Sequence, residues 1–356
     1  LCDWFFPAAI ERGYSLELTP TIWVVLRAFA SFGFCKAHAA AFALPTYQSA
    51  WLKTHYPAAF LAGVLTHDPG MYPKRLILDE VRQLGITIAP LDINRSDRSY
   101  RVERNGESEA IRLALTDLSG ISEGELDSII AHRPYIDLAD VIHRSGISRP
   151  IAESLLMVGA FDSLHPGLNR RDLLLHLNDL YRWARSTSRA ISSLDVSQLT
   201  FGFTPPVSKT GLPDLRDNER VRNEVEILGM DISHHMIDFY SEFLNQIGAI
   251  RSCDLLQQRS KSSVLVAGVK VALQTPPVRS GKRVMFLTLD DGYGCSDATF
   301  FEDAQRSYAE VLRNSWLLLV RGEIRRTGAR GISLRATEAW DLSRAYERWR
   351  SVAACE

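Results

Sequence analysis

This chain of 356 residues has few cysteines and no long apolar run. An odd number of cysteines without a Cys-x-x-Cys pair argues against a disulfide framework and a paired-cysteine zinc site. No apolar stretch reaches the ~18 residues of a membrane helix, and no basic region leads into an apolar one at the start, as in a secretion signal. We therefore expect a cytoplasmic protein. The cysteines are Cys2, Cys35, Cys253, Cys295 and Cys355.

Charge of one sign is not in large excess either. The formal net charge is −1, so the overall charge does not predict nucleic-acid binding. Within 264–340, eleven Lys and Arg stand against eight Asp and Glu, a surplus compatible with a surface that follows phosphates. The apolar fraction of 46% and the charged fraction of 23% are ordinary for globular domains, and the length allows two or three of them.

Acidic residues are absent from the stretch 33–57, which reads GFCKAHAAAFALPTYQSAWLKTHYP. Lys36 and His38 stand near its start, where a lysine and a histidine without a neighbouring carboxylate can meet the phosphates of a nucleotide. Such a pair is also common on ordinary protein surfaces, so both interpretations stay open from these residues alone. The apolar spacing predicts helices at 39–56 and 58–66, separated at Pro57.

Periodicity and composition divide the chain into six parts. The first two are helical, and the third is rich in Ser, Thr, Pro and Gly, as in a flexible linker. A helical connector, a region of short Val-, Leu- and Phe-rich strands and a C-terminal tail follow. The expected fold is therefore a multi-domain α+β protein. In chain order the parts are 1–107, 108–183, 184–217, 218–262, 263–342 and 343–356.

Two short helical hairpins are expected within 108–165, the first with its leading arm at 111–115. Their turns contain Gly120 and Gly146, spaced as in a tandem repeat, and Gly allows the positive φ of a tight turn. Backbone N–H groups at such a turn can bind a DNA phosphate, although packed helix pairs without a ligand have the same spacing. The first turn, 120–122, lacks the Gly-x-Gly order that phosphate-binding hairpins favour.

Five expected strands over 263–342, with a helix at 304–312 between the third and the fourth, have the order of an OB-fold, a barrel often used on single strands. Basic residues in its first and last hairpin loops are candidates for phosphate contacts. Phe286, Phe300 and Phe301 are candidates for stacking on bases, with filling of the barrel as the commoner alternative. The basic candidates are Arg279, Lys282, Arg283, Arg325, Arg326 and Arg330.

Adjacent histidines occur once, at His234 and His235. Neighbouring residues cannot easily face one metal from a helix, and we find no Cys, Asp or Glu partner at ligand spacing. We therefore expect a turn here and no metal site.

Several blocks resemble, in the same order, successive parts of the bacterial C-family DNA polymerases, the DNA polymerase III alpha subunits. The similarity is closest to the error-prone or accessory alpha-type enzymes. It implies that 33–57 belongs to the fingers, with Lys36 and His38 approaching the incoming nucleotide, and that Cys35 stands where replicative members usually have Asn. The further blocks are HDPGMYPKRLILDEVRQLGITIAPLDINRS at 67–96, MVGAFDSL at 157–164, ILGMDISHHMIDFY at 227–240, and 264–342.

The expected linker contains a segment that resembles the peptide with which bacterial polymerases bind the sliding clamp. In that peptide a Gln precedes spaced large apolar residues, which enter a pocket of the partner. A random linker can also supply such a short segment. The residues are Gln198, Leu199, Phe201 and Phe203.

Nucleotidyl transfer needs two divalent metals held by clustered carboxylates. The palm of the resembled family supplies them through a Pro-Asp-x-Asp-x-Asp segment, which this sequence does not contain. We therefore expect no catalytic residue and no cofactor in this chain, with Mg²⁺ held by the palm of full-length members.

The sequence is thus interpreted as the C-terminal template-handling part of such a polymerase, inactive by itself. Its expected partners are duplex and single-stranded DNA, a deoxynucleotide triphosphate and the clamp. Three alternatives stay open: a non-catalytic DNA-binding or mutasome accessory protein, a subunit that completes a split polymerase in trans, and a relic without activity.

Overall fold

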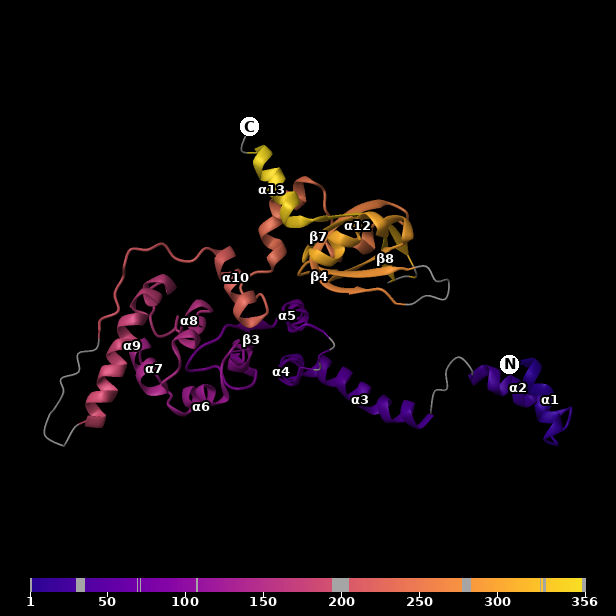
Figure 1. Cartoon of the computed structure of the whole chain (residues 1–356), viewed down its shortest axis with the longest axis horizontal. Helices are drawn as coiled ribbons and strands as arrows, with labels where there is room; N and C mark the ends of the chain where they lie inside the picture. The colour runs from indigo at the N-terminus through magenta and orange to yellow at the C-terminus, as the bar shows by residue number, and fades with distance from the viewer. Residues whose placement is uncertain are drawn as a thin grey trace. The chain divides into compact units, whose positions relative to one another are not determined.

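The computed structural model describes residues 2–29, 36–68, 70, 72–106, 108–193, 205–276, 283–326, 328 and 331–353. The chain forms two compact units, Leu1–Phe60 and Leu61–Glu356, and Figure 1 shows the elements of each along the colour gradient. Helices and strands both contribute, so the chain is a multi-domain α+β protein, as expected. Among the described residues, no helix combines the length and the apolar character needed to cross a bilayer.

The first unit is helical, as its periodicity predicted. Phe5 packs against Trp23 with ring centroids 5.2 Å apart. Val25 and Leu26 on the second helix each keep about half of their surface exposed. This unit therefore has little core of its own. Its helices are α1 (Cys2–Glu11), α2 (Leu18–Phe29), α3 (Lys36–His55) and the beginning of α4 (Pro57–His67).

The second unit begins with α5 (Lys74–Gln83) and a small sheet. Gly85, at φ +74°, turns the chain from the end of α5 into β1 (Thr87–Ala89), near the strand predicted at 86–90. β1 pairs in parallel with β3 (Ser108–Arg112), which pairs antiparallel with β2 (Arg101–Asn105).

The helical arm expected at 111–115 is wrong. Ile111 lies in β3, pairs with Ile88 of β1 and is fully buried. Between β3 and Gly120, all of which the structure describes, the chain forms only the 3-10 turn η1 (Leu115–Asp117). The apolar spacing of so short a segment fits a helix and a buried strand equally well, and pairing with β1 selects the strand.

Four helices follow the sheet. Gly146, at φ +62°, ends α7 in the left-handed conformation and starts the turn into α8, so the second helical hairpin has the expected form. α7 and α8 both contact the long helix α9. The helices are α6 (Glu123–Ala131), α7 (Leu138–Ser145), α8 (Arg149–Met157) and α9 (Arg170–Ser193).

The linker expected at 184–217 begins later than predicted. α9 continues through Ser193, because Leu180 and Ala184 keep its apolar stripe buried into the expected linker. The described part from 205 to 216 has no helix or strand, yet Thr210 donates from both its N–H and its hydroxyl to Asp172 of α9, at 2.9 and 2.6 Å. This stretch is thus held along α9 rather than free. The clamp-like segment 198–203 lies outside the described residues.

The connector leads into a closed five-stranded barrel. Its strands are ordered β4-β5-β6-β8-β7, and α12 lies between the third and the fourth strand in the chain, as predicted. The connector comprises α10 (Asp217–Leu228), η2 (Met236–Tyr240), α11 (Ser241–Gln246) and η3 (Ser252–Gln257). The barrel comprises β4 (Ser263–Gln274), β5 (Met285–Asp290), β6 (Cys295–Phe300), α12 (Glu302–Asn314), β7 (Leu317–Arg326) and β8 (Ile332–Asp341).

Inward side chains of all five strands fill the barrel. Phe300 is completely buried in this core together with Leu312 of α12. Gly268 on β4 lies so close to β5 that a Cβ there would come 2.8 Å from the carbonyl oxygen of Asp290. A larger residue at this position would force the two strands apart, so barrel closure explains the glycine.

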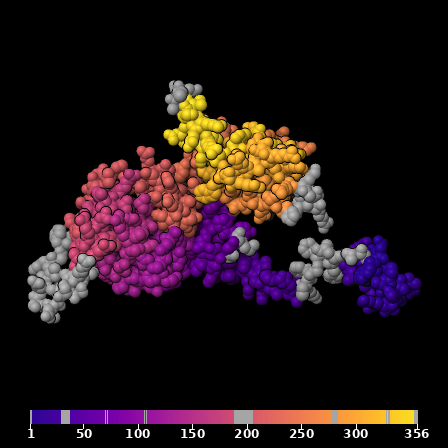
Figure 2. Space-filling model, viewed as in Figure 1, coloured from indigo at the N-terminus to yellow at the C-terminus, as the bar shows by residue number. Residues whose placement is uncertain are grey.

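The C-terminal tail expected at 343–356 is instead helix α13 (Leu342–Ala353). Leu342 is fully buried, and Tyr346 and Trp349 pack with it against Phe243 of α11. Figure 2 shows this yellow helix lying on the orange barrel. The apolar residues recur at helical spacing, so the segment has a face to bury and folds onto the barrel.

Substitution of Leu342 tests whether α13 is part of the barrel core. We expect Leu342→Ala to lower the free energy of unfolding by about 2–4 kcal/mol, because it removes a fully buried side chain and leaves a cavity. Val352→Ala, at a position 63% exposed on the same helix, should change it by less than about 0.5 kcal/mol. Urea unfolding followed by tryptophan fluorescence measures both. Equal effects of the two substitutions would contradict the packed helix.

Candidate nucleic-acid interface

A basic cleft opens on the side of the barrel where β6 meets α12. It has a volume of about 720 Å³, and Arg283, Arg306 and Arg335 line it. The guanidinium of Arg335 lies over the ring of Phe301, 5.5 Å from its centroid, and 3.3 Å from Asp303. Arg335 is thus held against the ring while its side chain stays more than half exposed, so it can meet a phosphate or a base.

A second cleft of about 480 Å³ shares Phe301 and Arg335 with the first. Lys261 and Arg325 line it. Arg325 and Arg326, which we expected in the last hairpin loop, instead lie at the end of β7 and pair with β8. Across the two clefts, six basic side chains face three acidic ones. The clefts thus form a continuous basic band that can follow a phosphate backbone.

The predicted basic residues differ in how free they are. Arg283 and Arg325 are exposed in the band. Arg326 donates to the carbonyl oxygens of Gln258, at 2.7 Å, and Leu256, so its guanidinium also braces η3. Arg279, Lys282 and Arg330 lie outside the described residues.

Sequence reasoning missed Lys261, Arg306 and Arg335. It also did not say which of the three phenylalanines fill the barrel and which lie at its surface. Phe300 fills the core, Phe286 is 43% exposed on β5, and Phe301 supports Arg335. A signal for Arg335 was present, because it alternates with the buried Leu334 and Ala336 and must therefore point outward.

The turn between α7 and α8 opens into a third cleft, of about 670 Å³. Gly146, Arg149 and Arg185 line it, and Tyr181 donates to the carbonyl oxygen of Ile147 at 2.9 Å. Arg149 and Arg185 bring positive charge to this turn, whereas Pro150 has no N–H and the N–H of Ser148 donates to Glu125. The second hairpin is therefore the better candidate for a phosphate.

Hydrogen-bond donors in the turn at Gly120 are satisfied by a side chain of the same chain. Gly120 has the expected positive φ of +82°, but the carboxylate of Glu125 accepts the N–H and hydroxyl of Ser122 at 3.1 and 2.7 Å. The other Glu125 oxygen accepts the N–H of Ser148, in the second turn, at 2.9 Å. One carboxylate thus takes donors of both turns that a phosphate would otherwise meet. Partial burial raises the pKa of Glu125, but these hydrogen bonds outweigh it and lower that pKa to about 2.

Removal of this carboxylate should loosen the hairpin pair. We expect Glu125→Ala to cost about 1–2 kcal/mol near neutral pH, through the lost capping box and the freed Ser148 N–H. Since folding lowers this pKa, the contribution exists above the ordinary value of 4.5 and fades as the pH falls toward 2. Thermal unfolding at pH 7 and pH 3 measures it. Glu123→Ala, in the same turn but exposed, is the matched control, and a pH-independent effect of Glu125→Ala would contradict the bridge.

The predicted nucleotide-binding residues lie in the first unit. Lys36 begins α3, and His38 is exposed in its first turn, with its ring 4.5 Å from that of Phe42. Gln198, Leu199, Phe201 and Phe203 lie outside the described residues. Lys36 and His38 are two positions apart on one helix and so do not lie on the same face, and their role stays a prediction.

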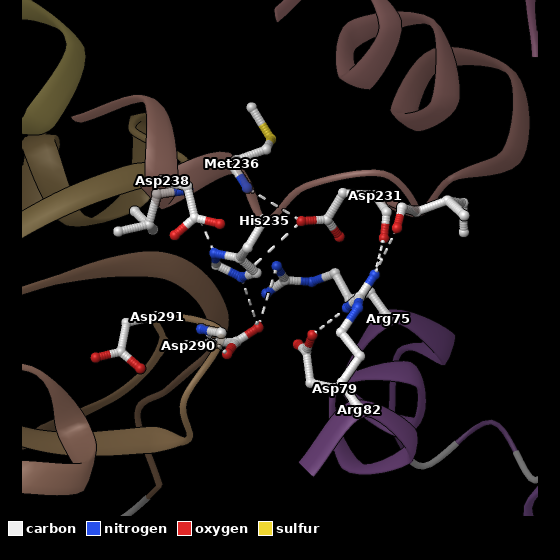
Figure 3. Close-up of polar contacts among 12 residues, drawn as sticks. Arg75, Asp79, Arg82, Asp231, His235, Met236, Asp238, Asp290 and Asp291 are labelled. Atoms are coloured by element: carbon white, nitrogen blue, oxygen red, sulfur yellow. Dashed lines mark hydrogen bonds and ion pairs between the residues drawn. The ribbon is translucent and has the colours of Figure 1, made fainter. Parts of the chain in front are cut away.

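The chain bends at His234, as expected, but sequence reasoning found no acidic partner for His235, and the structure places two beside it. His235 is buried, with its Nε2 3.4 Å from Asp290 and 4.0 Å from Asp231 (Figure 3). Asp79, His235 and Asp290 offer side-chain atoms within 4.8 Å of one another. The carboxylates come from α5 and the end of β5, so no local spacing could reveal them.

Comparison with known families and proteins agrees with this architecture. Residues 85–173 match the helix-hairpin-helix motif family, and residues 264–342 match a family described as an OB-fold nucleic acid binding domain. Among solved structures, RecG bound to a three-way DNA junction is 14% identical with a TM-score of 0.22, covering 49% of this chain and 24% of that one. A TM-score this low supports no conclusion.

Relatives cover almost the whole chain. An error-prone DNA polymerase of Symbiobacterium thermophilum is 32% identical over 86% of this chain and 32% of its own length. The DNA polymerase III alpha subunits of Vibrio cholerae and Escherichia coli K12 are each 30% identical over 97% of this chain and 30% of their own length. The chain spans about a third of the curated relatives it matches. Over that third, the protein is a homologue of the DNA polymerase III alpha subunits and error-prone DNA polymerases.

Proposed function

We propose that this chain is the DNA-handling part of a DNA polymerase III alpha-type enzyme, acting in replication or translesion synthesis. The observation that carries the proposal is the basic band on the OB barrel, where Arg335 lies on Phe301 beside Arg283. In the proposed arrangement this band holds the single-stranded template through phosphates and stacking. The α7–α8 turn contacts the backbone of the duplex without reading its sequence.

Two finer parts of the proposal rest on the resemblance of the sequence. Lys36 and His38 would approach the triphosphate of an incoming nucleotide, and the segment from Gln198 to Phe203 would bind a sliding clamp. Helix α3 supports the first part, because it begins at Lys36 and has no acidic residue in its first turn. Positive charge at this end of a helix adds to the favourable dipole for an anion.

Salt-dependent binding of a short single strand tests the barrel surface. We expect the double variant Arg283→Ala, Arg335→Ala to bind more weakly and to reduce the slope of log K against log salt by about 1.4, or about 0.7 for each lost phosphate contact on a single strand. Fluorescence anisotropy with a labelled oligonucleotide measures this. Arg344→Ala, exposed on α13 and outside both clefts, is the control. An unchanged slope in the double variant would remove the band from the binding surface.

Primer extension tests whether this chain binds DNA without catalysing nucleotide addition. We expect the purified chain to bind primed DNA and to add no nucleotide in the presence of Mg²⁺ and deoxynucleotide triphosphates, because transfer needs clustered carboxylates that hold two metals. A gel-based extension assay with a complete polymerase of the family as the positive control measures it. Extension that persists through repeated purification would contradict the proposal that this part is inactive alone.

A further inference from the structure

Five charged or ionisable side chains are buried together where three segments of the second unit meet. Arg75 and Asp79 come from α5, Asp231 and His235 from the segment after α10, and Asp290 from the end of β5. Each keeps less than a tenth of its surface exposed. Figure 3 shows these side chains pointing toward one another between α5 and the barrel. Buried charges are costly unless each one is paired, so the pairing decides what this junction does.

Asp290 is the best-satisfied carboxylate of the cluster. Its Oδ2 lies 3.4 Å from both Nη1 of Arg75 and Nε2 of His235, and its Oδ1 accepts the N–H of Gly292 at 3.0 Å. Burial raises the pKa of Asp290, but these donors and charges outweigh it and hold that pKa below its ordinary value. Asp290 is therefore the anion of the cluster.

One hydrogen bond of His235 favours the neutral ring, because it needs an unprotonated Nδ1. Its Nδ1 accepts the N–H of Ile237 at 3.3 Å and so caps η2. A ring that accepts at Nδ1 carries its proton on Nε2, which then donates to Asp290. Burial lowers the pKa of His235, whereas Asp290 and Asp231 raise it by more. The ring is thus the competing place for an additional proton, at the cost of the cap.

The same geometry argues against a metal ion between Asp79, His235 and Asp290. A histidine ligand offers a lone pair and usually donates from its other nitrogen, but here the nitrogen facing the carboxylates carries the proton. The guanidinium of Arg75 also lies against the Asp290 oxygen that a cation would need. The cluster must balance its charge in another way.

Asp79 is the carboxylate that leaves the charge of the cluster unbalanced. One of its oxygens, Oδ1, accepts from Arg82, which also donates to the carbonyl oxygens of Asp231 and Ile232 at 2.8 and 3.1 Å. No donor within the described part of the chain reaches its other oxygen, Oδ2, which is buried. With three carboxylates against two guanidinium groups, the cluster carries one excess negative charge. A proton on Asp79 Oδ2 removes that charge and supplies the missing donor toward Asp290.

We propose that Asp79 is held as a carboxylic acid that donates to Asp290, and that this shared proton latches α5 to the OB barrel. When the proton leaves, two buried carboxylates face each other without a donor between them, and repulsion loosens the contact. Arg75 extends the same contact, since its guanidinium lies 5.9 Å from the centroid of Trp316 on the barrel. The latch thus couples proton concentration to the attachment of a nucleic-acid-binding module.

The electrostatic surroundings of Asp79 support this assignment. Burial and the neighbouring Asp290 raise the pKa of Asp79 from 3.8 to about 7, against the lowering effects of Arg82 and His235. Because folding raises the pKa of this acid, its stabilising contribution is complete below about pH 4 and is lost as the pH rises to about 7. The titratable and charged groups around Asp79 are Arg75, Arg82, Asp231, His235, Asp290 and Cys295.

Hydrogen exchange of the α5 amides in the full chain tests the latch. We expect protection factors for 74–83, corrected for the intrinsic rate at each pH, to fall at least roughly tenfold between pH 6.0 and pH 8.5. Asp79→Asn keeps a donor toward Asp290 without a charge, so its α5 protection should stay constant over this range. Asp179→Asn, an exposed aspartate on α9, should behave like the unmodified chain. Constant protection in the unmodified chain would by itself overturn the proposal, whether or not Asp79→Asn folds.

Infrared spectroscopy distinguishes a proton on Asp79 from a proton on His235. We expect the unmodified chain to show a carboxylic acid carbonyl band at pH 6.0 that disappears by pH 8.5 and that Asp79→Asn lacks. If the pH dependence of exchange persists in Asp79→Asn without such a band, His235 holds the proton and the assignment to Asp79 is overturned.

Discussion

Closure of the barrel is the constraint on which the candidate interface depends. β8 pairs with β7 along most of its length and meets β6 in parallel at only two positions, one of them Thr299 with Arg335. A strand held on both sides must alternate its side chains between core and solvent. The closing pair therefore brings the outward Arg335 next to Phe301, which leaves the end of β6. Without it, Arg283, which precedes β5, would line no common cleft with residues of α12 and β8.

In the hairpin pair, unlike in the basic band, an acidic side chain occupies donors that could bind an anion. Glu125 places a carboxylate against donors of both turns, so part of the anion-binding capacity of the motif is satisfied by the chain itself. What remains outward at the second turn is the start of α8 with Arg149 and Arg185 nearby. Positive side chains favour contact with the DNA backbone rather than reading of the bases. The two modules thus suit different features of a primed template, the duplex backbone and the single strand.

Much of the architecture could be predicted because it follows from local rules. β4–β8 and α12 match the expected strand and helix order, since strand periodicity and Gly-containing turns are written within each segment. The second hairpin follows from Gly146 for the same reason. The errors at 111–115 and 343–356 share a cause. In both, a short or amphipathic segment takes the structure that buries its apolar side against a partner far along the chain.

The sequence alone determined the family resemblance and the OB-fold order, because ordered motifs and periodicity do not depend on distant contacts. Only the tertiary structure decided which charges act together. It joined Arg335 to Phe301, tied Arg326 to η3, and brought Asp79 within reach of an aspartate more than two hundred positions away. The physical reason is that burial and the neighbours of a charge set its protonation and its cost, and both exist only after folding.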